Sequence, residues 1–102
     1  SENIQKYIVS IVNSTRKPDF YKLNDLNQLI SFGASPRATI SMAIASRALA
    51  FVNHRSYVIP EDVRQIGKAI LRHRIQLTYE AEAEEVTTED IIDQIFTSIP
   101  TP

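Results

Sequence analysis

Apolar residues recur at helical spacing from the first residues of the chain onward. The segment over residues 3–15 has the i, i+3, i+4, i+7, i+8 spacing that gives a helix one apolar face. The residues of this face are Ile4, Tyr7, Ile8, Ile11 and Val12. Arg16 and Lys17, followed by Pro18, predict the end of this helix, because cations suit a helix C-terminus and proline cannot continue the turn.

The middle of the chain predicts three more helical segments. A short piece over residues 25–32 has apolar residues at Leu26, Leu29 and Ile30, and Gly33 is expected to stop it. A long helix over 36–53 is apolar around most of its circumference, which predicts a place in the middle of a bundle. Its two apolar stripes are Ile40, Ile44, Ala48, Phe51 and Met42, Ala45, Leu49, Val52. The next helix opens at Pro60, and its expected buried face is Val63, Ile66, Ile70 and Leu71.

The last third of the chain changes period. Ile75, Leu77 and Tyr79 alternate with polar residues, which is typical of a strand, and we expect it to pair with residues 57–59. The acidic segment 80–85 is compatible with either a helical extension or a solvated loop. The final helix begins after Thr87, a candidate N-cap with Asp90 three residues later. Its buried face is expected to be Ile91, Ile92, Ile95, Phe96 and Ile99.

These elements predict one all-α domain over residues 1–102, a small bundle of four to five helices with a short two-stranded pairing as an option. The 43% apolar and 23% charged content is that of a globular protein. The absence of cysteine excludes disulfides and thiolate metal sites. No apolar run is long enough to span a membrane, and no signal-like segment opens the chain, so we expect a cytoplasmic protein.

Charge is distributed unevenly along the chain. The net charge of −1 argues against a general nucleic-acid binder. No acidic residue occurs between Leu26 and Pro60, and no basic residue follows Arg74. A basic centre and an acidic tail fit two interpretations: solvated faces that complement one another, or surfaces for partners.

Arg37 is the most unusual of these charges. Ser35 is a favoured N-cap and Pro36 is favoured at the first helical position, so Arg37 is predicted as the second residue of the long helix. A cation there is unfavourable by about 0.3–1 kcal/mol, because the helix dipole is positive at this end. A guanidinium beside free backbone N–H groups suits a phosphate. The alternative is that Arg37 reaches a distant carboxylate and has no further role.

No catalytic motif accompanies this cation. The sequence holds no phosphate-binding glycine loop, no H-E-x-x-H and no G-x-S-x-G motif. His54 and His73 each lie beside arginine rather than among carboxylates, so neither a metal site nor a histidine-based triad is expected. Taken alone, the chain looks catalytically incomplete.

Three blocks of sequence resemble the C-terminal lid of MoxR-type AAA+ ATPases. They are FGASPRATISMAIASRALAF, YVIPEDVRQIGKAILRHRI and LTYEAEAEEVTTEDIIDQI, and the resemblance covers residues 4–99. The G-A-S-P-R-A and L-R-H-R-I blocks are its most specific parts. In that family the arginine of S-P-R-A is the sensor 2 residue, which contacts the terminal phosphates of ATP, and the matching position is Arg37. Ile59 is a departure, because relatives often have Thr or Ser there, and it leaves the following helix without a side-chain N-cap.

The resemblance implies a lid that closes over ATP and relays its phosphate state to a ring of subunits, with a hexamer expected. ATP and Mg2+ would be bound mainly by a core domain of the same protein that this chain lacks. Ser35, Pro36 and Arg37 would form the lid's share of the nucleotide site. The parent protein is thus expected to be an ATPase with a chaperone-like or protein-maturation role, acting on a metalloprotein or a von Willebrand A-type client. Alone, the chain is expected to be a monomer without turnover.

Other roles remain open from the sequence. Arg72 and Arg74 are expected to face the core domain or a neighbouring subunit, or else simply to complement the dipole of their helix. The lid of a magnesium-chelatase-type AAA+ subunit is a close alternative. A non-enzymatic module that docks a basic partner through segment 80–85 is another. A DNA-binding module fits less well, because a groove-reading helix needs polar side chains on its exposed face.

Overall fold

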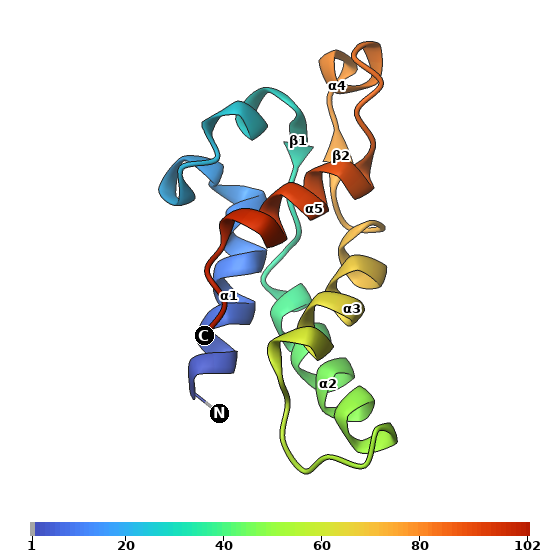
Figure 1. Ribbon diagram of the computed structural model, residues 1–102. Coiled ribbons are helices and arrows are strands. Elements are labelled where there is room, and N and C mark those ends of the chain that lie inside the picture. The colour runs from blue at the N-terminus through green and yellow to red at the C-terminus, as the bar shows by residue number, and fades with distance from the viewer. Residues whose placement is uncertain (1) are drawn as a thin grey trace.

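Five α-helices, two short 3₁₀ helices and one two-stranded sheet make up residues 2–102 of the protein. The computed structural model describes residues 2–102 (Figure 1). In chain order the elements are α1 (Glu2–Arg16), η1 (Pro18–Tyr21), η2 (Asn24–Gln28), β1 (Ile30–Phe32), α2 (Arg37–Val52), α3 (Pro60–Leu71), β2 (Gln76–Leu77), α4 (Tyr79–Ala83) and α5 (Thr88–Ser98). The predicted helical bundle is confirmed: the bounds of α1 and α2 lie within one residue of the predicted 3–15 and 36–53, and α3 and α5 begin where predicted. No described helix is long and apolar enough to cross a membrane.

The core lies where α1, α3 and α5 meet the first half of α2. The five residues of the predicted apolar face of α1 are all buried, and so are Ile91, Ile92 and Ile95 of α5 and Ile99 directly after it. On α3, Val63 and Leu71 are fully buried while Ile70 packs against the core from its edge. Gly67 lets α2 and α5 approach α3 closely, because a Cβ there would lie 2.8 Å from Phe96 Cζ and 2.9 Å from Met42 Cε. The amphipathic stripes therefore form one shared core.

The two-stranded sheet differs from the predicted one. β1 pairs with β2 in antiparallel register, with Ile30 opposite Leu77 and Phe32 opposite Gln76. The predicted strand over 75–79 is thus partly right, but its predicted partner, residues 57–59, has no strand structure. The predicted helix over 25–32 is wrong beyond Gln28, since residues 30–32 form β1. The prediction failed because an apolar pattern over only eight residues does not distinguish a continuous helix from a single helical turn followed by a strand.

Gly33 has a different role from the predicted helix stop. A Cβ at Gly33 would lie 2.2 Å from the carbonyl oxygen of Thr15, so only glycine fits against the last turn of α1. Beside it, the Ala34 N–H donates to Thr15 Oγ1 at 2.9 Å, and that hydroxyl donates to the Val12 carbonyl at 2.7 Å. These contacts fix the segment that leads from β1 into α2.

Capping explains where α4 and α5 begin. Thr87 Oγ1 accepts from the Asp90 N–H, and Asp90 Oδ2 accepts from the Thr87 N–H, so the predicted cap of α5 is confirmed. Thr78 Oγ1 accepts from the Ala81 N–H and starts α4. The acidic segment 80–85 is therefore a helix as far as Ala83 and irregular after it.

The long helix α2 is not central, contrary to the expectation from its composition. Its buried residues are Ala38, Met42, Ser46 and Ala50, which are spaced four apart and face α1 and α3. The opposite face carries Ile40, Ile44 and Phe51, which are 63%, 61% and 80% exposed. The predicted burial all round is therefore wrong, and the second predicted stripe is buried only in part, since Met42 is buried but Val52 is 68% exposed.

Candidate anion site at the start of α2

The start of α2 is built by three consecutive residues with exposed side chains, Ser35, Pro36 and Arg37. Pro36 is already helical, with φ −57° and ψ −22°, and Arg37 is the first residue of α2 rather than the predicted second. The Ala38 N–H donates to the Ser35 carbonyl at 2.9 Å, and the Thr39 N–H donates to the Pro36 carbonyl at 3.1 Å. The first turn is thus closed by backbone groups.

This geometry corrects the predicted N-cap. No side-chain hydrogen bond caps α2, so Ser35 contributes its carbonyl oxygen and not its hydroxyl. The Ala38 and Thr39 N–H groups are used within the turn, which leaves fewer free donors for an anion than the sequence predicted. Proline at 36 accounts for this, because its fixed φ continues the helical geometry one residue upstream. Arg37 is therefore the main source of positive charge at this end of α2.

The side chain of Arg37 is accessible to a ligand from solvent. This side chain is exposed, and within residues 2–102 it makes no hydrogen bond or ion pair. Neither ion pair of the described residues involves Arg37. Its guanidinium is thus open to an anion that approaches from outside residues 2–102.

Arg72 and Arg74 lie at the same end of the α2–α3 pair as Arg37. Four residues connect β1 to α2, and four connect α3 to β2. Because β1 pairs with β2, the start of α2 and the end of α3 both lie near this sheet (Figure 1). Both arginines are exposed, and neither side chain has a partner in the part of the chain that the structure describes. Their expected contacts with a core domain or subunit remain predictions.

One partly buried ion pair that the sequence did not single out links the residues after α2 to α3. Arg55 donates from both terminal nitrogens to the Asp62 carboxylate, at 2.6 and 2.7 Å, and the Ile59 N–H donates to Asp62 Oδ2 at 3.0 Å. The hydrogen bonds from Arg55 hold the pKa of Asp62 below its ordinary value, and Asp62 raises the pKa of Arg55. Asp62 thus binds the backbone N–H of the N-cap residue Ile59, although no side chain caps the first turn of α3. In the sequence, the only sign of this role was that Asp62 is the third residue of α3, where an acidic side chain can accept a hydrogen bond from the N-cap N–H.

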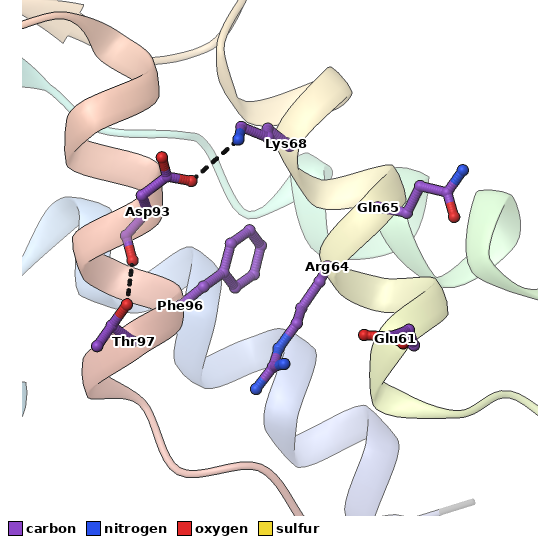
Figure 2. A pocket seen from close by; sticks show the side chains of 7 residues that line it. All are labelled: Glu61, Arg64, Gln65, Lys68, Asp93, Phe96 and Thr97. Carbon is purple, nitrogen blue, oxygen red and sulfur yellow. Dashed lines mark hydrogen bonds and ion pairs between the residues drawn. The ribbon is translucent and has the colours of Figure 1, made fainter.

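A separate groove between α3 and α5 lies open to solvent, with a volume of about 620 Å³. Figure 2 shows Lys68 reaching across it to Asp93, at 3.1 Å, with the Phe96 ring beneath and Arg64 pointing away from this pair. Arg64 Nε donates to the Tyr7 hydroxyl at 3.4 Å. The groove is lined by two cations, Arg64 and Lys68, and by two acids, Glu61 and Asp93, so it has no excess of positive charge that would select an anion. Nowhere in residues 2–102 do three or more histidine or acidic side chains gather as metal ligands.

Comparisons with known proteins agree with this architecture. The model of the AAA lid domain family matches residues 24–95. The chain is 43% identical over 96 residues to "Chaperone MoxR1" of Mycobacterium tuberculosis and 32% identical over 108 residues to "Protein MoxR" of Paracoccus denitrificans. These alignments cover 94% and 100% of the chain but only 26% and 32% of the two relatives.

A solved structure shows the same fold. The crystal structure of a "putative ATPase" from Cytophaga hutchinsonii superimposes with a TM-score of 0.95 at 43% identity, covering all of this chain and 31% of that one. The chain therefore spans about a third or less of the relatives that it matches. With its family model, fold and MoxR relatives in agreement, the chain belongs to the AAA lid domain family.

Proposed function

We propose that this chain is the sensor 2 lid of a MoxR-type AAA+ ATPase and that Arg37 contacts the terminal phosphates of bound ATP. The observation that carries the proposal is the exposed Arg37, which has no protein partner within residues 2–102 and stands at the positive end of α2. A guanidinium binds phosphate oxygens in a two-pronged geometry, and the helix dipole adds to its attraction.

The chemistry assigned to Arg37 is stabilisation of charge. Negative charge on a transferring phosphoryl group is stabilised by fixed cations, and loss of one such group costs about 100-fold or more in rate. The described residues provide no gathering of acids for Mg2+, so in this proposal the metal, the phosphate loop and the attacking water belong to a core domain. The isolated chain then has no turnover and only weak affinity for nucleotide.

The same proposal gives the lid a role in coupling. Closure of Arg37 onto the phosphates would tie the position of the lid to the nucleotide state, and neighbouring subunits of a ring would sense that position. The parent would be a cytoplasmic ATPase that assists the maturation of a client protein. Relatives named "Chaperone MoxR1" and "Protein MoxR" support this choice over the lid of a magnesium-chelatase-type subunit.

Hydrolysis by the full-length protein tests the role of Arg37. Arg37→Ala is expected to reduce ATP turnover about 100-fold while the circular dichroism of the lid is unchanged. Arg16→Ala is the matched control, because Arg16 is also an exposed arginine but lies at the end of α1. Equal turnover by Arg37→Ala and the wild type would contradict the sensor role.

A further inference from the structure

The first turn of α2 has no side-chain anchor of its own. No side chain caps it, and the hydrogen bonds that close it run from the Ala38 and Thr39 N–H groups to the backbone carbonyls of residues 35 and 36. A helix end without a side-chain cap is less stable and frays more readily. Arg37 is the first residue of this turn. A contact from outside α2 is therefore needed to keep Arg37 in one position.

Thr15, the last residue but one of α1, contacts the segment before α2 through both its backbone and its side chain. Its carbonyl oxygen lies so close to Gly33 that a Cβ there would be 2.2 Å away. Its hydroxyl accepts a hydrogen bond from the Ala34 N–H at 2.9 Å and donates one to the Val12 carbonyl at 2.7 Å. Because the Val12 carbonyl takes the hydroxyl proton, the lone pairs of Oγ1 are left for the Ala34 N–H. Thr15 thus joins the last turn of α1 to the segment that leads into α2.

Few backbone rotations remain between this hydrogen bond and Arg37. Thr15 and Ala34 are 1% and 0% exposed, so water does not replace the bond without entering the core. The Ser35 carbonyl closes the first turn of α2, and the ring of Pro36 holds its φ at −57°. Without the Thr15 hydroxyl, the Ala34 N–H would be buried and unpaired, which is unfavourable enough to make the segment shift towards a new partner. Such a shift moves Arg37.

We infer that Thr15 is a positioning residue for Arg37: its hydroxyl, through the Ala34 N–H, sets where the guanidinium stands relative to a bound phosphate. This inference rests on the proposed function of Arg37. Displacement of a functional group by about 1 Å costs up to about 100-fold in rate, even when the substitution lies away from the ligand. Because Thr15 is buried within the lid, it acts on the phosphate only through Arg37.

Three variants of the full-length protein separate positioning from stability. Thr15→Val keeps the shape of the side chain and removes the hydroxyl, whereas Thr15→Ser keeps the hydroxyl and removes a buried methyl group. Ser14→Ala is the matched control. The Ser14 hydroxyl is also buried in the last turns of α1 and donates to the Ile11 carbonyl at 2.6 Å, but within residues 2–102 it makes no hydrogen bond to the segment before α2.

Calorimetric titration with ADP and with a non-hydrolysable ATP analogue measures the preference for the additional phosphate. We expect Thr15→Val to lower this preference about tenfold, because the guanidinium is still present and only its position changes. Thr15→Ser and Ser14→Ala should keep the preference, although both lose stability. In an Arg37→Ala background, Thr15→Val should have no further effect.

The outcomes distinguish this inference from the proposed function. An unchanged preference in Thr15→Val, or an equal loss in Ser14→Ala, would overturn the positioning role. If Arg37→Ala loses the preference and Thr15→Val does not, the positioning role alone is refuted. An unchanged preference in Arg37→Ala would refute the phosphate contact and the positioning role together.

Hydrogen exchange in the full-length wild type tests the same coupling without any variant, and so decides the question even if Thr15→Val does not fold. Coupling between ligand binding and the Thr15–Ala34 bond is reciprocal, so the ATP analogue should protect the Ala34 N–H about tenfold more than ADP does. The Ala81 N–H, which donates to Thr78 Oγ1 at 3.2 Å at the start of α4, is the matched control and should be protected equally with both nucleotides. Equal protection of the Ala34 N–H by the two nucleotides would overturn the inference.

Discussion

Gly33 offers a sharp test of how the start of α2 is held. A Cβ at this position would lie 2.2 Å from the Thr15 carbonyl oxygen, 2.5 Å from its carbon and 2.8 Å from the Arg16 nitrogen. All three are backbone atoms in the last turn of α1, so they cannot move without disrupting that turn. The φ of Gly33 is not positive, so close approach and not backbone conformation is what requires glycine.

The expected cost of Gly33→Ala follows from this overlap. Overpacking a core typically costs about 1–3 kcal/mol of unfolding free energy. For an overlap with rigid backbone, we expect a cost at or above the upper end of that range. We therefore expect a loss of about 3 kcal/mol or more, from a total of roughly 5–15 kcal/mol for a domain of this size. The melting temperature should fall by about 12 °C or more. Urea denaturation followed by circular dichroism measures the change.

The other glycine of the chain is the matched control. A Cβ at Gly67 meets only the ends of the Phe96 and Met42 side chains, which can rotate away. Alanine also favours the interior of α3 by about 1 kcal/mol, which offsets part of the crowding. Gly67→Ala should therefore cost less than about 1 kcal/mol. The reasoning is refuted if Gly33→Ala is no more destabilising than Gly67→Ala.

Two further predictions concern buried polar groups. Asp62→Asn should lower the free energy of unfolding by about 1.5–3 kcal/mol, because it removes the charge that accepts hydrogen bonds from Arg55 and Ile59. The lowered pKa of Asp62 means that its contribution is present above its ordinary value of 3.8 and is lost as pH falls below it, so acid titration should destabilise the wild type more steeply than the variant. Ser46→Ala should raise the free energy of unfolding by about 1 kcal/mol, since it removes an unpaired buried hydroxyl from a helix; a loss of similar size in urea denaturation would show that the hydroxyl is satisfied.

The sequence predicted the elements whose signals are local. α1 and α5 each bury the apolar face that their spacing predicts, and Thr87 with Asp90 caps α5 as expected. The lack of an acidic residue near Arg37 in sequence is also a local signal, but the exposure of its side chain was not predicted.

Features that depend on distant contacts were not predictable in this way. β1 and β2 are three and two residues long, so their pairing across more than 40 residues leaves almost no pattern in either segment. The need for Gly33 comes from α1, which lies far away in sequence. The two apolar faces of α2 look alike in sequence, and only packing shows that Met42 is buried while Ile44 is exposed.

The central claim is that Arg37 contacts the terminal phosphates of ATP, and nucleotide affinity measures this most directly. Full-length wild type, Arg37→Ala and the Arg16→Ala control are titrated by calorimetry with ADP and with a non-hydrolysable ATP analogue. The account predicts that Arg37→Ala weakens binding of the ATP analogue more than binding of ADP and so removes the preference for the additional phosphate. An unchanged ratio of the two affinities would contradict it.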